Sequence, residues 1–167
     1  DTATGSGPLG RMVDRQYLDA VGWRGIRQRK LHVEELLRHA LERLQGEGRA
    51  LHLVDVAAGH GRYVLDGVAR SGHQPDSIVL RDFSDINVRD GAALISSRGL
   101  DGIARFEKGD AFDAGQLAAL SPRPTLGIVS GLYELFADND MVARSLAGLA
   151  AAVEEGGYLI YTGQPWH

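Results

Sequence analysis

The stretch LHLVDVAAGHGRYV, residues 51–64, decides the fold of this chain. A hydrophobic run reaches an acid at Asp55 and passes through a turn with glycines at positions 59 and 61. A segment long enough for a helix follows, so we expect a strand, a tight turn and a helix in that order. The first amides of such a helix have no partner within it and point towards the end of the strand. The stretch therefore predicts a ligand cradle, although an ordinary strand-to-helix turn with incidental glycines would give the same local pattern.

Two further acids strengthen the cradle interpretation. Asp82 ends the next β-prone run, 21 residues after Gly61, where a carboxylate can accept the hydroxyls of a ribose. Asp110 follows the third run, where it can accept a hydrogen bond from an adenine amino group while Phe112 lies beside the ring. Each acid alone is typical of a solvated loop, but all three together predict a nucleoside site at one edge of a sheet.

Short β-prone runs alternate with helix-length segments along the chain. The runs cover residues 51–56, 77–81, 103–108, 125–130 and 158–162, and the segments between them cover 61–70, 85–97, 114–120 and 141–153. This alternation predicts an α/β fold of Rossmann-like type, a parallel sheet with helices on both faces that binds ligands beyond the carboxyl ends of its strands. Ahead of it we expect a linker or disordered segment over residues 1–10 and a helical cap over 11–48 that includes an amphipathic helix at 31–44. Residues 49–167 form the predicted core.

The composition excludes several classes of protein. The chain has 167 residues, 44% hydrophobic and 24% charged, which suits one globular domain. The formal charge of −4 argues against nucleic acid as a partner, and no apolar stretch approaches the roughly 18 residues of a membrane span. There is no cysteine and the histidines lack ligand spacing, so we expect no metal. With no initiator methionine and no signal peptide, we expect a cytoplasmic piece of a longer multidomain chain.

Two nucleoside cofactors fit such an edge, a nicotinamide dinucleotide and S-adenosylmethionine. Dinucleotide sites need a third glycine for close helix packing, and Val64 stands at that position. Asp55 would also lie near the pyrophosphate, a like-charge contact that costs roughly 1 to 4 kcal/mol at about 4 Å. S-adenosylmethionine carries positive charge and no phosphate, so the acid favours it. An NAD-dependent oxidoreductase and a non-catalytic cofactor-binding module remain alternatives.

At this point the sequence resembles the class I S-adenosylmethionine-dependent methyltransferases. The resemblance is carried by VDVAAGHG (54–61), LRDFS (80–84), GDAF (109–112), IVSGLYE (128–134) and GGYLI (156–160). More narrowly, GWRGIRQR (22–29) and YTGQPWH (161–167) resemble a bacterial group of methyltransferase domains that often follow an α/β-hydrolase-like domain. The family sheet ends with two further strands, which are absent from this sequence, so either the chain is truncated or its last strand is exposed to a partner.

The resemblance implies S-adenosylmethionine as the cofactor and assigns roles to individual residues. Gly59 and Gly61 would admit the methionine part, Asp55 would orient its amino group, and the Ser130 carbonyl would face the ammonium. Asp82 would bind the ribose and Phe83 would flank the adenine. The predicted cofactor-binding residues are Asp55, Ala57, Gly59, Gly61, Asp82, Phe83, Asp110, Ala111, Phe112 and Ser130. Ala57 replaces the first glycine of many members, and we expect it to keep a negative φ.

Methyl transfer also needs groups that face the acceptor. Tyr133 and Glu134 follow the fourth predicted strand, and a carboxylate there can orient or deprotonate a nucleophile, so we predict both as catalytic residues. An acid at the start of a helix is equally typical of a favourable interaction with the helix dipole. The acceptor is expected to be a small or lipid-like molecule of unknown identity. A basic segment over residues 23–30 either folds over the cofactor, caps the fold, meets an acidic lipid headgroup, or lies on a solvated face.

Overall fold

The computed structural model describes residues 6–163, and at its centre lies a parallel sheet of five strands. The strands are β1 (His52–Val56), β2 (Ser77–Asp82), β3 (Ala104–Lys108), β4 (Leu126–Val129) and β5 (Tyr158–Tyr161). Their order is β3-β2-β1-β4-β5, and every neighbouring pair is parallel. The chain starts in the middle, moves outward through β2 and β3, and then returns to β4 on the other side of β1. The direction changes between β1 and β4, where open α/β sheets bind their ligands.

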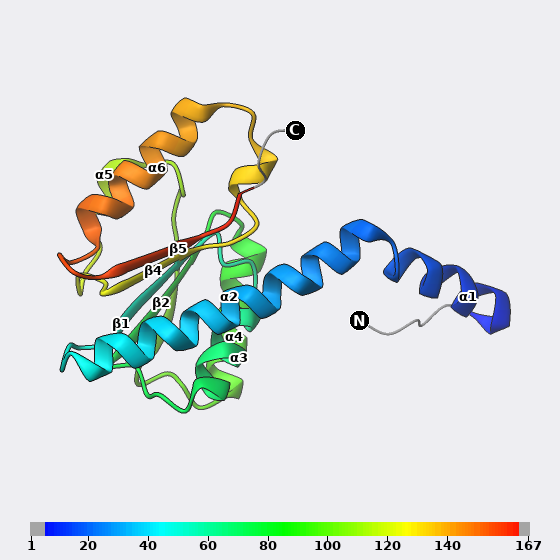
Figure 1. The fold of residues 1–167 in the computed structure, drawn as a ribbon, viewed down its shortest axis with the longest axis horizontal. Coiled ribbons are helices and arrows are strands. Elements are labelled where there is room, and N and C mark those ends of the chain that lie inside the picture. Colours follow the sequence, from blue (N-terminus) through cyan, green and yellow to red (C-terminus); the bar gives the residue numbers. More distant parts are fainter. Residues whose placement is uncertain (1–5, 164–167) are drawn as a thin grey trace. The chain divides into compact units, whose positions relative to one another are not determined.

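Helices separate the strands, as the sequence predicts. They are α3 (Arg62–Ser71), α4 (Asp85–Ser97), α5 (Ala114–Ala118) and α6 (Asn139–Ala152), with a single 3-10 turn, η1 (Tyr133–Leu135), between β4 and α6. α5 and α6 cover one face of the sheet, and α3 and α4 cover the other (Figure 1). The prediction of an α/β Rossmann-like fold with helices on both faces is therefore confirmed.

Close approaches at glycines show how the helices pack. A Cβ atom on Gly148 of α6 would lie 2.8 Å from the Ala114 backbone of α5. A Cβ on Gly91 of α4 would lie 2.1 Å from the Phe106 ring of β3. The central strands are buried on both faces, which explains their continuous apolar sequences. These contacts fix the helices against the sheet and leave the carboxyl ends of the strands to build a site.

The segment ahead of the sheet differs from the prediction. α1 (Gly7–Leu18) occupies residues that include part of the linker expected over 1–10, because a proline in its first turn starts a helix well. Residues 1–5 lie outside the described part of the chain. α2 (Val21–Gly46) begins ten residues before the predicted 31–44 helix. The contacts within the chain form two compact units, Asp1–Val33 and Glu34–His167, and divide inside α2. The predicted domain boundary at 48–49 stays a prediction.

Candidate functional site

The turn after β1 holds three residues in the left-handed backbone region. Ala57, Gly59 and Gly61 have φ angles of +58°, +58° and +72°. The expectation that Ala57 keeps a negative φ is therefore wrong. Its backbone is held on one side by β1 and on the other by the Ala58 amide, which donates to the Arg81 carbonyl at 2.9 Å. A residue other than glycine costs about 1 to 2 kcal/mol in this conformation, so the turn stores strain.

The two glycines of the turn serve different purposes. A Cβ on Gly61 would lie 2.3 Å from Cδ1 of the buried Leu80, so the backbone approaches the core too closely for any side chain. A Cβ on Gly59 would meet nothing within 4 Å. The Gly59 amide instead donates to Oδ2 of Asp82 at 2.9 Å. Gly61 thus lets the turn pack on the sheet, and Gly59 links the turn to the acid at the end of β2.

Asp82 is held rigidly at the end of its strand. Its Oδ1 accepts from the Ser84 amide at 2.9 Å and from Nδ2 of Asn87 at 3.0 Å. A carboxylate has about four acceptor directions, and these two bonds and the one from Gly59 use three of them. One direction on Oδ2 is left to accept a hydrogen bond from a ligand.

Asp55 lies fully buried in β1, below the turn. Tyr63 of α3 donates its hydroxyl to Oδ1 of Asp55 at 2.5 Å. Oδ2 is buried and has no hydrogen-bond partner within the described chain. Burial raises the pKa of Asp55 to about 8, and the nearby charge of Asp82 adds to this, against the lowering effect of the Tyr63 hydrogen bond. Asp55 therefore carries a proton at neutral pH until a positive charge arrives beside it.

A cavity of about 330 Å³ opens beyond the carboxyl ends of β1, β2 and β3. Six of the predicted cofactor-binding residues line it, namely Ala57, Asp82, Phe83, Asp110, Ala111 and Phe112. The structure therefore brings together the part of the predicted site assigned to ribose and adenine. Asp55, Gly59, Gly61 and Ser130 lie outside this lining; Asp55 is buried under the turn, and Gly59 reaches the cavity through its bond to Asp82.

Aromatic rings form much of the cavity wall. Phe112 and Phe136 meet edge to face, with their ring centres 4.7 Å apart. Phe83 is 72% exposed, and Nζ of Lys108 lies 5.9 Å from its ring centre, held there by an ion pair with Asp85. In the same lining, Asp110 accepts a hydrogen bond from the Phe112 amide on Oδ1 at 2.8 Å. The wall thus offers flat apolar faces together with a carboxylate that keeps Oδ2 for another donor.

The two predicted catalytic residues do not line this cavity. Tyr133 is buried in the core against α6, where its hydroxyl is 2.9 Å from Oγ of Ser145. Burial, the largest effect, raises the pKa of the Tyr133 hydroxyl. Glu134 follows it in η1, with Oε2 buried. Both residues lie in the segment between β4 and α6, which also contributes to the cavity lining, and their catalytic roles stay predictions.

Apart from Gly109, which begins the GDAF stretch, sequence reasoning missed three residues of the lining, Leu132, Phe136 and Met141. All come from the loop after β4 and the first turn of α6. The apolar run around Phe136, in a loop at the carboxyl end of a strand, was the available signal. Arg81 was also missed; it lies buried in β2 directly before Asp82.

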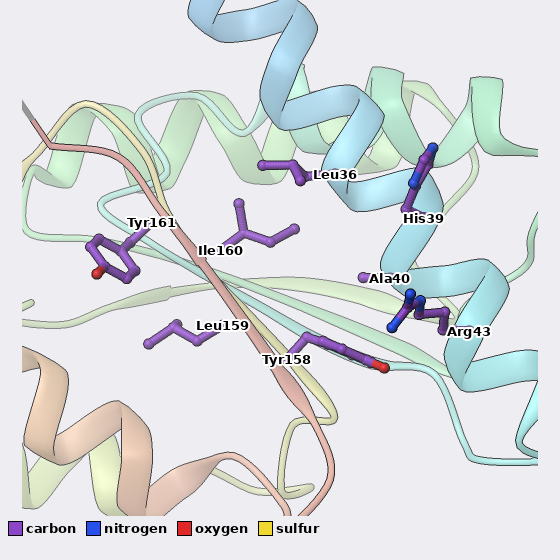
Figure 2. A pocket seen from close by; sticks show the side chains of 8 residues that line it. All are labelled: Leu36, His39, Ala40, Arg43, Tyr158, Leu159, Ile160 and Tyr161. Atoms are coloured by element: carbon purple, nitrogen blue, oxygen red, sulfur yellow. The ribbon is translucent and has the colours of Figure 1, made fainter.

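A second groove of about 390 Å³ lies away from this site, between α2 and the edge strand β5. Figure 2 shows Leu36, His39, Ala40 and Arg43 of α2 on one side of the groove and Tyr158 to Tyr161 of β5 on the other. Nothing in the groove matches a predicted site residue. Within residues 6–163 no group of three acidic or histidine side chains could hold a metal ion, and no helix is both long and apolar enough to cross a bilayer.

The whole chain, residues 1–167, matches the family described as "Putative methyltransferase". The chain belongs to this methyltransferase family. It is 58% identical over 163 residues to the "Uncharacterized protein YnbC" of Escherichia coli (strain K12), which covers 98% of this chain. The match takes up 28% of YnbC, so the chain spans little more than a quarter of the length of this relative.

Solved structures share the fold of this chain. A "possible exported protein" from Bordetella parapertussis superposes with a TM-score of 0.71, covering 96% of this chain and 49% of its own at 19% identity. A "SAM-dependent methyltransferase" from Thiobacillus denitrificans, crystallised with S-adenosyl-L-homocysteine, gives a TM-score of 0.50 at 18% identity, covering 66% of this chain and 42% of its own. At such low identities these likenesses concern the fold alone.

Proposed function

We propose that this chain is the cofactor-binding core of a methyltransferase that uses S-adenosylmethionine as its methyl donor. The observation that carries the proposal is the cavity at the carboxyl edge, where Asp82, Asp110 and three phenylalanine rings surround about 330 Å³. Two carboxylates and flat apolar faces suit the ribose, the amino group and the ring of an adenosine.

The buried Asp55 supports a ligand with positive charge. Its Oδ2 has no partner within the described chain, and an uncompensated polar atom at zero exposure is expensive. The ammonium of a methionine group, directly or through a water molecule, would supply the missing donor and favour the ionised acid. A pyrophosphate at this place would instead disfavour the ionised acid, because two negative charges repel each other. The residues present therefore fit S-adenosylmethionine.

The other residues would each bind a different part of the cofactor. Asp82 would accept a ribose hydroxyl on the one free direction of Oδ2, while the Gly59 amide keeps the carboxylate in place. Asp110 would accept the adenine amino group on Oδ2, and the Ala111 amide would donate to the adjacent ring nitrogen. Phe83 and Phe112 would cover the two sides of the base. The Ser130 carbonyl, just after β4, would face the ammonium.

Bound here, the cofactor supplies an electrophilic methyl group on a sulfonium. The chain contributes by holding it in one orientation and by excluding water, since methyl transfer in line with the acceptor depends mainly on positioning. Glu134 would orient or deprotonate the acceptor, and the buried Tyr133 would fix the loop that carries Glu134. We propose a small or lipid-like acceptor.

The proposal extends to the longer protein in which this core functions. Because the chain spans 28% of YnbC, the acceptor site can include residues from outside it. A fusion to an α/β-hydrolase-like domain and a location in the cytoplasm belong to the proposal as well, and the gene around this segment tests the fusion.

Calorimetric titration tests the cofactor directly. We expect S-adenosylhomocysteine to bind with micromolar affinity and NAD to show no heat of binding. Asp82→Ala should weaken S-adenosylhomocysteine by about 1.5 to 3 kcal/mol, the range for a hydrogen bond to a charged group. Asp101→Ala, which removes an exposed acid bonded to Ser96, is the control and should leave the affinity unchanged.

Binding of NAD alone would overturn the proposal in favour of an oxidoreductase. Turnover of labelled S-adenosylmethionine with candidate acceptors then separates an enzyme from a binding module. Tight cofactor binding without turnover of any acceptor, in the full-length protein, would favour the module.

A further inference from the structure

Arg81, the residue before Asp82 in β2, is a buried cation with few partners. Only 5% of the residue is exposed. Nη2 donates to Oε1 of Gln116 at 3.2 Å, while Nε and Nη1 have no hydrogen-bond partner within the described chain. A buried guanidinium usually has a carboxylate against it, because removing the charge from water costs several kcal/mol. The cost of burying the Arg81 guanidinium without a carboxylate beside it therefore needs an explanation.

An ordinary ion pair does not account for this side chain. Glu107 is the register partner of Arg81 on β3, so the two Cα atoms are neighbours across the sheet. The Glu107 carboxylate nevertheless accepts from Nε of Arg105 at 2.6 Å. An apolar residue would fill the position of Arg81 without leaving donors unsatisfied. The buried charge is therefore unfavourable for stability alone, as is common for residues that serve a binding site.

The guanidinium lies directly behind the loop that lines the cavity. A Cβ atom on Gly109 would lie 2.2 Å from Nη2 and 2.6 Å from both Cζ and Nε of Arg81. Gly109 is the first residue of the loop over 109–113, and its amide donates to the Asp82 carbonyl at 3.0 Å. The absence of a side chain at Gly109 thus lets Arg81 pack against the loop backbone.

Arg81 also reaches the far end of the same loop. Its partner Gln116 donates from Nε2 to Oδ2 of Asp113 at 2.8 Å. Asp113 caps α5 by accepting the Gln116 amide on Oδ1 at 3.0 Å. One side chain therefore touches the loop at Gly109 and is linked through Gln116 to Asp113, on either side of the three residues expected to contact adenine.

We propose that Arg81 is a positioning residue that holds the loop over 109–113 in the shape required to bind the adenine of the cofactor. The proposal rests on the proposed function, because it assumes that this loop reads an adenine. Arg81 does not line the cavity, so its effect passes through the backbone at Gly109 and through the hydrogen bonds of Gln116. The buried charge of Arg81 lowers the stability of the fold but holds the loop in one conformation.

The test compares three variants of the chain. Arg81→Met replaces the guanidinium by an apolar side chain of similar length. Gln116→Ala cuts the link to Asp113 at an exposed position where folding is not at risk. Arg49→Met is the matched control, because Arg49 also lies over a glycine, Gly156, but pairs with Glu154 and precedes β1 at the opposite end of the sheet.

We expect Arg81→Met to bind S-adenosylhomocysteine about tenfold more weakly, within the range for residues that act on a site without touching the ligand. Its preference over S-inosylhomocysteine, which lacks the adenine amino group, should also fall. The thermal midpoint without ligand should stay the same or rise. Hydrogen exchange without ligand should accelerate at the amides of Phe112 and Gln116, and Gln116→Ala should show the same changes to a smaller degree. Arg49→Met should lose stability and keep its affinity.

Unchanged affinity and unchanged exchange in Arg81→Met would overturn the proposal. If Arg81→Met fails to fold, Gln116→Ala decides by the same two measurements. Failure of the wild-type protein to bind S-adenosylhomocysteine would instead overturn the proposed function and with it the adenine-binding role. The exchange measurement, which needs no ligand, would still show whether Arg81 fixes the loop.

Discussion

The polar groups at the two ends of the sheet differ in whether they have hydrogen-bond partners. At the amino ends of the strands, the Leu51 amide donates to Oδ2 of Asp76 at 2.7 Å, and the His52 amide donates to Oγ1 of Thr125 at 3.0 Å. The same Thr125 hydroxyl donates to the Ala50 carbonyl at 2.8 Å. These side chains satisfy partly buried groups of the backbone, so this end contributes to stability.

At the carboxyl ends, Asp55 and Arg81 keep buried atoms without partners within residues 6–163, and Ala57 has a strained backbone. Thr125 at the amino end is as deeply buried as Asp55 and Arg81, so burial of a polar side chain does not by itself explain the difference. Unsatisfied polar atoms and strain are instead gathered at the edge with the cavity. We infer that this edge is less stable than it could be because its groups serve binding. Removing an unsatisfied or strained group there should therefore raise stability, whereas removing a satisfied group at the amino end should lower it.

The largest expected effect comes from Gly61. Gly61→Ala brings a Cβ against the buried Leu80 in addition to its unfavourable φ, and should cost about 2 to 5 kcal/mol in the free energy of unfolding. Gly59→Ala has a similar φ but open space, and should cost only about 1 to 2 kcal/mol. Urea denaturation measures both. Equal losses would show that the close approach to Leu80 is unimportant.

Asp55 should give the carboxyl edge a distinctive dependence on pH. Its pKa is raised to about 8 in the folded chain from 3.8, so between these values the folded state holds a proton that the unfolded state has lost. As far as Asp55 is concerned, the free energy of unfolding is therefore highest below pH 4. It falls by about 1 kcal/mol for each pH unit as the pH rises towards 8.

Asp55→Asn removes this titration without removing the side chain. Wild type should therefore lose stability relative to Asp55→Asn as the pH rises from 5 to 8. Urea denaturation of both proteins across that range measures the difference. A constant difference would mean that Asp55 is ionised throughout and that the buried edge tolerates its charge.

The opposite end should respond in the opposite way. Thr125→Val leaves the His52 amide and the Ala50 carbonyl without the hydroxyl that now satisfies them, and should cost about 1 to 3 kcal/mol. The affinity for S-adenosylhomocysteine should stay the same, because Thr125 precedes β4 at the end remote from the cavity. Weaker binding, measured by calorimetry, would remove the distinction between the two ends.

Ala57→Gly should have the smallest effect, in the stabilising direction. Glycine relieves the positive φ, and the greater freedom of the unfolded chain offsets part of the gain, which leaves about 0.5 to 1 kcal/mol. A shift of the denaturation midpoint to higher urea concentration checks it. A destabilised variant would show that the turn holds Ala57 by contacts of its methyl group.

Local signals in the sequence predict most of the fold. The α4 helix has the predicted bounds, 85–97, because Ser84 caps its start and the β-prone runs before and after it limit its length. Only the first turn of α1, residues 7–10, was assigned to a linker, because the composition of residues 1–10 is typical of linkers, whereas a helix needs only a favourable first turn. The positive φ of Ala57 follows from how the turn is held between β1 and β2, which no local pattern reveals.

The sequence predicts only those site residues that stand at the ends of strands. Asp82 is the last residue of β2 and Asp110 lies two residues after β3, so their convergence follows from the parallel topology. Phe136 enters from a loop whose path depends on η1, and Arg81 acquires its role by packing against Gly109. Such contacts depend on the tertiary structure and cannot be predicted from spacing along the chain.

Proton release on ligand binding tests the central claim most directly. Wild-type protein should be titrated at pH 7 with S-adenosylhomocysteine in two buffers that differ in their heat of ionisation. A protonated Asp55 that ionises beside an ammonium should release nearly one proton for each ligand bound, and Asp55→Asn should release none. Binding with the same heat in both buffers would contradict the account, because the buried carboxyl would then not respond to the ligand at all.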